Sequence, residues 1–350
     1  MFCYSLTQIL KDRLSKFLQC SAILILMGMS LTLGFYSCAP TSTVIPPPDT
    51  NLFRSEDYAV YRLPKAETPA DLAERFLGDK NRAWVIEEAN QGVIFESGRS
   101  VVIPLKDRNK GGITAEGFQT IPILAYHRFA KNCKSPLCMP ARIFELQMRY
   151  LKENGYSVLT PEELLAFLEY RQSFPKKSVL ITMDDGYRSV YNIAYPILKK
   201  YGFHAIFFIY TDFVGVSSLA ITWDQLREMK VNGFTIGSHT MFHSDLTKKK
   251  DGETGAGFIA RIKKELFGSK KIIDKKLEQD TWIFAYPYGR YDQRTLEFTR
   301  LAGYKIAMSV TRGGNPFFAY PLSLRRDQVL KRNMKRFISR LKTFNPMVLK

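Results

Sequence analysis

Histidine is scarce in this 350-residue chain: there are only four, and none follows His243. Cysteine occurs five times and tryptophan three times. Acidic residues are also few, 33 against 51 basic ones, so the formal net charge is +18. This charge favours contact with anionic surfaces or polymers. The chain has no nucleic-acid recognition motif, however, and we expect no nucleic-acid partner.

The pattern of the first residues is typical of an export signal and not of a part of the fold. Basic residues precede an apolar run over residues 17–36, and Ser37-Cys38-Ala39-Pro40 follows. This order resembles a bacterial lipoprotein signal over residues 1–37, which implies a lipidated Cys38 at the start of the mature protein. An uncleaved membrane anchor is the alternative. Both interpretations predict an extracytoplasmic protein tethered to a membrane, in the bacterial periplasm or cell envelope.

Two thiols remain in the body of the chain once the signal and Cys38 are set aside. These are Cys133 and Cys138, and no further cysteine or histidine lies near enough in sequence to complete a familiar metal site. Outside the cytoplasm such a pair is expected to oxidise. The sequence therefore predicts a short-loop disulfide between them.

A proline-rich linker over residues 38–57 leads into a small unit over residues 58–105. Within it, Thr68-Pro69-Ala70-Asp71 has the pattern of a capping box that begins a helix. A strand-helix-helix-strand order is expected, and together with Asn90 it resembles a LysM module. That resemblance implies binding of N-acetylglucosamine-containing glycans. A small structural domain that binds nothing is the alternative.

After a connector over residues 106–120, residues 121–345 alternate between strand-like and helix-like stretches, which predicts a parallel sheet flanked by helices. The fold class is therefore α/β. About seven strands favour a distorted or incomplete (β/α) barrel. The expected strands are 121–126, 179–183, 204–210, 234–237, 282–285, 304–310 and a weaker one near 322–329.

Polar residues with catalytic potential follow the expected strands. His127 follows the first strand, Asp184-Asp185-Gly186 the second, His239 the fourth and Tyr286-Pro287-Tyr288-Gly289 the fifth. The carboxyl ends of barrel strands form the rim on which such folds build active sites. We therefore expect these residues to share one site.

Two imidazoles and one carboxylate of the Asp pair can bind a divalent metal. His239 and His243 are four residues apart, so a tight turn could direct both rings at one ion. The second carboxylate would remain beside the metal as a base. The same ligand set also occurs in non-haem iron oxygenases, which usually have antiparallel β folds, and this remains an alternative.

Three motifs resemble, in order and context, those of the NodB-type polysaccharide deacetylases: Thr182–Gly186, Ser238–His243 and Ala285–Gly289. The resemblance implies a metal-dependent hydrolase that removes acetyl from N-acetylglucosamine units of a polysaccharide by cleaving a linear amide bond. It further implies that Asp185, His239 and His243 bind the metal, zinc in the first place, with cobalt, nickel or iron as alternatives. Asp184 would be the general base, and the backbone N–H of Tyr288 would help to bind the oxyanion.

The chain departs from that family pattern at two points. Ala285 stands where many members have an arginine, and no histidine follows His243 to act as the general acid. The stretch Ile123–His127 resembles the subgroup that acts on poly-β-1,6-N-acetylglucosamine, which assigns His127 as general acid. The two departures also motivate an alternative function, a catalytically inactive glycan-binding lipoprotein of the cell envelope.

Other candidate residues have plainer interpretations. His204 is expected to begin a buried strand and to be structural. Trp223 and Tyr286 could line a sugar-binding groove, but packing is the simpler reading. The basic segment 325–342 is expected to form a terminal helix with a solvated cationic face.

Overall fold

The computed structural model describes residues 51–330 and 333–347. The expected signal, Cys38 and most of the expected linker lie outside these residues. Within the described part of the chain, no helix combines the length and the apolar character needed to cross a membrane.

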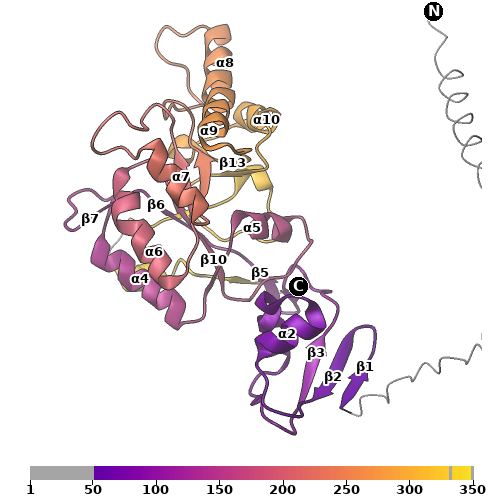
Figure 1. The fold of residues 1–350 in the computed structure, drawn as a ribbon. Helices are drawn as coiled ribbons and strands as arrows, with labels where there is room; N and C mark the ends of the chain where they lie inside the picture. The colour runs from indigo at the N-terminus through magenta and orange to yellow at the C-terminus, as the bar shows by residue number, and fades with distance from the viewer. Residues whose placement is uncertain (1–50, 331–332, 348–350) are drawn as a thin grey trace, which may run out of the picture. The chain divides into compact units, whose positions relative to one another are not determined.

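The small N-terminal domain has the expected strand-helix-helix-strand order (Figure 1). The Thr68 hydroxyl accepts from the Asp71 N–H, and the Asp71 carboxylate accepts from the Thr68 N–H. Gly78 ends the helix in the left-handed conformation. Asn90 bonds through its side chain to the backbone of Val102 and Ile86, which ties the second helix to the last strand. The elements are β1 (Leu52–Arg54), β2 (Tyr58–Arg62), α2 (Pro69–Leu77), α3 (Ala83–Ala89) and β3 (Ser100–Pro104), with sheet order β1-β2-β3.

Two segments expected to be irregular are ordered. β1 lies inside the expected linker 38–57 and pairs with β2, so the linker prediction was wrong at its end. The connector 106–120 forms β4 (Ile113–Thr114) and β5 (Gly117–Gln119), and β5 pairs with β16 (Phe344–Pro346). β1 is ordered by pairing with the adjacent β2, and β5 by pairing with β16 from the end of the described chain, which local sequence does not reveal.

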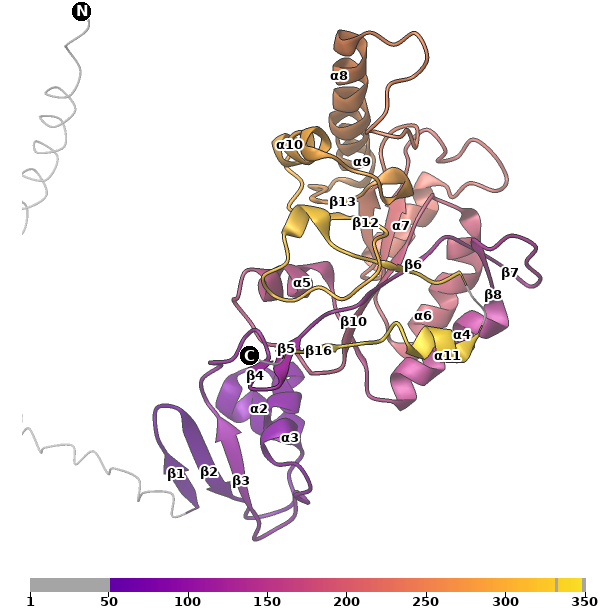
Figure 2. The ribbon, with the colours of Figure 1, turned by 180° about the vertical axis from the view of Figure 1, so that it is seen from behind.

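A sheet of parallel strands forms the centre of the C-terminal domain, and the prediction of a seven-stranded incomplete barrel is confirmed (Figure 2). The spatial order is β14-β13-β12-β11-β10-β6-β15, and the short β9 (Ser157–Val158) pairs with β10. The seven strands are β6 (Ile123–Tyr126), β10 (Ser178–Met183), β11 (Ile206–Ile209), β12 (Thr235–Ser238), β13 (Ile283–Ala285), β14 (Ile306–Met308) and β15 (Asp327–Gln328).

Alternate strand residues fill two apolar cores, because successive side chains point to opposite faces. On β10, Leu180 belongs to the core inside the barrel, whereas Val179 and Ile181 pack outward. The helices cover the outer faces, and α4, α6 and α7 pack beside one another against β6, β10 and β11 (Figure 1). The main helices are α4 (Ala141–Glu153), α5 (Pro161–Leu168), α6 (Tyr195–Tyr201), α7 (Trp223–Val231), α8 (Gly255–Lys263), α9 (Ser269–Leu277) and α10 (Gln293–Leu301).

One short segment closes the barrel. Leu324 forms a parallel bridge with Met308 at the end of β14, and Ser309 N–H donates to the Leu324 carbonyl. Three residues later, Asp327 pairs with β6. The segment therefore contacts both edge strands, and its alternation turns Leu324 and Arg326 toward the interior.

The predicted cationic terminal helix is largely wrong. The described residues of this segment contain only α11 (Met334–Ile338), five residues long. Arg326, which falls both in this predicted helix and in the predicted weak strand near 322–329, is completely buried. Tertiary pairing of residues 324–328 with two strands overrides the local helical spacing.

Candidate active site

The sheet register brings the candidate residues to one rim. Met183 pairs with Tyr126, so Asp184 and His127 leave neighbouring strands at the same level. Ser238 pairs with Phe284, which places His239 beside Ala285. The carboxyl ends of four strands thus supply the site, as the sequence predicted.

Asp185, His239 and His243 converge on one point. His239 Nε2 lies 3.6 Å from Asp185 Oδ1, and His243 Nε2 lies 3.4 Å from the same oxygen. Ligand atoms bound to one ion at about 2.1 Å lie roughly 3 to 3.5 Å apart, so this set fits a divalent metal. Asp185 and His243 remain partly exposed, which leaves one side of the site open.

Hydrogen bonding orients His239 for metal binding. Its Nδ1 lies 2.7 Å from the Ala285 carbonyl oxygen, which can only accept, so Nδ1 carries the proton. Nε2, the atom facing Asp185, is then the lone-pair nitrogen that a metal needs. Ala285, which stands where many family members have an arginine, thus orients His239 through its backbone carbonyl.

Burial sets the protonation of the three candidate ligands. It lowers the pKa of His239 to about 3 and also lowers the pKa of His243. Both rings are therefore neutral at pH 7, the form that binds metal. Burial, reinforced by the charge of Asp184, raises the pKa of Asp185 to about 7. A bound cation would relieve the cost of burying that carboxylate.

A buried glutamate that the sequence analysis missed holds the histidine loop. One oxygen of Glu265 accepts from the backbone N–H groups of Met241 and Phe242, both at 2.9 Å. Glu265 is 1% exposed and lies in a π-helical turn between α8 and α9. Its place in a charged helical stretch, twenty-two residues after His243, offered no sequence signal.

Asp184 is held by Arg326 and not by the metal ligands. The guanidinium donates to both carboxylate oxygens at 2.7 and 2.8 Å, and also to the Thr182 hydroxyl and the Ser309 carbonyl. Burial alone would raise the pKa of Asp184, but the Arg326 charge overrides it and lowers the pKa to about 2. Asp184 is therefore ionised at neutral pH.

Arg326 also changes how the alanine at position 285 is interpreted. From the sequence alone, the missing arginine before Pro287 was one of the two departures that motivated a catalytically inactive alternative. The structure supplies a guanidinium from the barrel-closing segment instead, with its planar group over the Phe208 ring. The one available sequence signal was that Arg326 continues the alternation of Leu322 and Leu324 in the stretch predicted as a weak strand near 322–329, and its cationic neighbours obscured it.

His127 and Tyr288 lie on the same rim. His127 is 9% exposed, and its imidazole forms no hydrogen bond with another described residue. Burial lowers its pKa, whereas the charge of Asp184 opposes that shift. The Tyr288 ring packs on His243, with centroids 4.8 Å apart.

Backbone strain is concentrated at this site. Among the described non-glycine residues, six have φ in the left-handed region, and four of them are Asp185, Thr240, His243 and Tyr288. Such conformations cost about 1 to 3 kcal/mol each and persist only where surrounding contacts impose them. The strain supports a functional interpretation of the rim.

Comparison with known proteins identifies the family. The family model for polysaccharide deacetylase matches residues 171–307. The Bacillus subtilis protein YxkH, named as a polysaccharide deacetylase, is 36% identical over 208 residues, which are 59% of this chain and 71% of that protein. The chain belongs to the polysaccharide deacetylase family.

Other relatives agree with this assignment. A poly-β-1,6-N-acetyl-D-glucosamine N-deacetylase of Staphylococcus aureus is 32% identical over 204 residues, 55% of this chain and 70% of that protein. Streptococcus pyogenes deacetylase PplD, solved in complex with acetate, superposes with a TM-score of 0.57 at 31% identity, covering 64% of this chain and 98% of that one. IcaB from Ammonifex degensii gives 0.57 at 27% identity, covering 64% and 96%.

The NodB-type resemblance is therefore confirmed, and the chain is a hydrolytic deacetylase by family. The oxygenase alternative is wrong, because the deacetylase barrel is parallel and not a double-stranded antiparallel fold. Three smaller expectations are also resolved. His204 is exposed and precedes β11, so its prediction as buried was wrong. Tyr286 is fully buried and Trp223 is partly buried against the outer core, so both serve packing.

Proposed function

We propose that this deacetylase uses a divalent metal to hydrolyse the acetamido group of N-acetylglucosamine units in a polysaccharide, releasing acetate. The observation that carries the proposal is the convergence of Asp185, His239 and His243 on one point. Zinc fits two imidazoles and one carboxylate, and cobalt, nickel or iron accept the same ligands. The Staphylococcus aureus relative, named for an N-acetylglucosamine polymer, supports the substrate class.

A metal held by these three residues would supply Lewis acidity, which acidifies water and polarises an amide carbonyl. Asp184 then acts as the general base, because Arg326 keeps it ionised and fixes its orientation. It accepts one proton as water adds to the acetyl carbonyl carbon. When the C–N bond breaks, the leaving amine takes a proton, and acetate departs.

His127 is the proposed donor of that proton, because it lies beside Asp184 on the rim. Burial lowers the pKa of His127 and the Asp184 carboxylate offsets only part of that shift, so the acid role is argued from position and not from resting charge. The N–H of Tyr288, in a loop stiffened by Pro287, is the proposed donor to the oxyanion. These roles rest on position and on the family resemblance.

The inactive glycan-binding lipoprotein remains the alternative function. Two departures motivated it, a missing arginine and a missing late histidine. Arg326 pairs with Asp184, so the proposed base has a guanidinium partner although Ala285 replaces the arginine. The proposed donor His127 answers the second.

We further propose that the protein works outside the cytoplasm, tethered to a membrane through Cys38 or an N-terminal anchor. The disulfide Cys133–Cys138 supports an oxidising compartment. The LysM-like domain is proposed to bind the same class of glycan. Its βααβ order supports this, although Asn90 itself serves as a structural link.

The decisive experiment combines metal analysis with acetate release. Purified protein is loaded with zinc, treated with N-acetylglucosamine oligomers, and assayed for acetate and for free amines. Asp184→Asn should keep its metal and lose acetate release, whereas Asp185→Ala should lose both. An Asp184→Asn variant that still releases acetate at the original rate would overturn the assigned base, and glycan binding without any free amine would favour the alternative.

A further inference from the structure

One cavity is lined by residues that closely follow His127 and Asp185 in the sequence. Its volume is about 460 Å³, and Arg128, the residue after His127, lines it together with Tyr187, two residues after Asp185. The Arg128 guanidinium lies 5.7 Å from the centre of the Tyr187 ring.

All charges in the walls of this cavity have one sign. Arg128, Lys134 and Arg188 line it, and no aspartate or glutamate does. None of the three forms an ion pair with a carboxylate of the described residues. Arg188 is fixed by donating to the carbonyls of Ala220 and Ser217, which hold the guanidinium without neutralising it.

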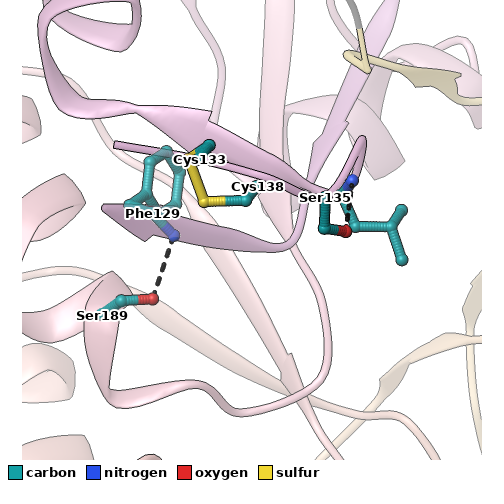
Figure 3. The surroundings of a disulfide bond; sticks show 6 residues. Phe129, Cys133, Ser135, Cys138 and Ser189 are labelled. Carbon is teal, nitrogen blue, oxygen red and sulfur yellow. Dashed lines mark hydrogen bonds between the residues drawn. A yellow bond between two sulfur atoms is a disulfide. The ribbon is translucent and has the colours of Figure 1, made fainter. Parts of the chain in front are cut away.

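The walls are also held rigidly. β7 (Arg128–Ala130) pairs with β8 (Cys138–Pro140), and the Cys133–Cys138 disulfide closes the loop between them that carries Lys134 (Figure 3). The backbone N–H of Phe129 donates to the Ser189 hydroxyl at 3.0 Å, which ties this loop to the segment after Asp184-Asp185-Gly186 (Figure 3). The backbone that carries Lys134 is thus restrained at the wall, so less loop ordering is needed when a ligand binds.

The charge of the cavity acts on the rim itself. Arg128 directly follows His127 and lines the cavity, so an anion bound there would lie within electrostatic range of the reacting centre. A free amine there would be repelled, and free amines are what the proposed reaction leaves on the polymer.

We propose that this cavity, which we call the cationic pocket, is a subsite for an anionic group on the polymer next to the sugar being deacetylated. The preferred substrate is then a glycan whose N-acetylglucosamine units neighbour a residue bearing a carboxylate or a phosphate, and not a neutral homopolymer. Polar neighbours Asn132, Ser135 and Asn192 supply additional hydrogen-bonding groups in the same walls. The inference rests on the proposed deacetylase function and specifies its substrate.

The test compares three oligosaccharides of equal length: neutral N-acetylglucosamine pentamer, an oligomer in which alternate residues carry a lactyl carboxylate, and a pentamer bearing a 6-phosphate. The zinc-loaded full chain is assayed for acetate release, and kcat/KM is measured at low and high salt. We expect at least one anionic oligomer to be favoured about tenfold at low salt, and the preference to shrink as salt rises. Comparing the two anionic arms identifies the carboxylate or the phosphate as the ligand.

Three variants locate the effect. Lys134→Gln and Arg128→Gln should each lower the ratio of anionic to neutral kcat/KM about three- to tenfold. Lys276→Gln removes the same charge from the exposed face of α9, far along the chain, and should leave the ratio unchanged. The ratio cancels any general loss of activity, so a poorly folded variant does not imitate the result.

The outcomes separate this inference from the function on which it rests. Release of acetate from the neutral pentamer with equal or greater efficiency overturns the anionic subsite and leaves the deacetylase function intact. An anionic preference that survives both pocket substitutions places the anion elsewhere and also overturns it. If none of the three oligomers loses acetyl, the proposed function and this inference fail together.

Discussion

Arg326 and Asp184 are 142 residues apart in sequence and form a two-bond ion pair inside the barrel. Arg326 is 0% exposed and Asp184 is 2% exposed. Arginine matches a carboxylate with two parallel donors, so this pair fixes direction as well as charge. It connects the segment that closes the barrel to the motif that begins the active site.

Replacing Arg326 by methionine is expected to cost stability. The substitution leaves the Asp184 carboxylate buried without a partner, and breaking one side of a buried pair typically costs about 3 to 5 kcal/mol. Urea unfolding of the two proteins measures the difference. The double variant Arg326→Met with Asp184→Asn removes the stranded charge and should recover part of the loss; no recovery would contradict this account.

The same pair predicts a change in pH dependence. Arg326 holds the pKa of Asp184 at about 2, and the ionised base is present above that value. Arg326→Lys keeps one charge but loses the two-bond geometry. Burial should then raise the pKa of Asp184, and the acidic limb of kcat/KM should move to higher pH. Acetate release from pH 3 to 8 measures the limb. An unchanged limb would show that Asp184 is not the titrating base.

Each proposed metal ligand should be required for metal content. Asp185→Ala, His239→Ala and His243→Ala each remove one of three donors, and we expect bound metal to fall from about one to below 0.1 per chain after dialysis. Elemental mass spectrometry makes the measurement. His204→Ala is the matched control, because this histidine is exposed and outside the site. Full metal content in any of the three ligand variants would remove that residue from the assignment.

Glu265 should matter for metal affinity without touching the metal. Glu265→Ala frees the N–H groups of Met241 and Phe242, so the loop that carries His243 loses its anchor. Residues that orient ligands typically change affinity by about 10- to 100-fold. Competition with a chelator measures the zinc affinity. Glu265→Gln keeps an acceptor oxygen and should retain more affinity than the alanine variant; equal losses would argue against orientation by these bonds.

The disulfide should stabilise its loop without being needed for metal binding. Cys133 and Cys138 enclose four residues, and the loop-closure account gives about 2 kcal/mol for so short a ring. Urea unfolding of the double serine variant should show a loss of that order, while metal content stays unchanged. A variant that loses its metal would show that the loop supports the ligand set as well.

The sequence predicted which residues lie on the rim, because motif residues that follow expected strands can be recognised from local patterns. Asp184, Asp185, His239 and His243 were placed from local patterns, and the parallel register then brought them together. Arg326 and Glu265 were not predicted, because the role of each depends on partners more than 20 residues away in the sequence. Nothing local distinguishes a buried arginine in a basic segment from its solvated neighbours.

The ends of the domains were less predictable for a related reason. β1 and β5 are three-residue strands stabilised by pairing with neighbours, and β5 depends on β16 from the last residues of the described chain. Short strands carry too few residues to show a period. Helix beginnings were clearer, since Thr68, Thr160 and Thr222 each form a complete capping box.

Closure of the barrel by residues 324–328 has a consequence for biosynthesis. A ribosome or export channel delivers Asp184 well before Arg326, so during that interval the carboxylate has no guanidinium and the barrel has an open edge. A nascent chain stalled or clipped before Leu324 would therefore carry every predicted metal ligand yet lack an oriented base. Hydrolytic competence should therefore arise only once residues 324–328 have joined the barrel.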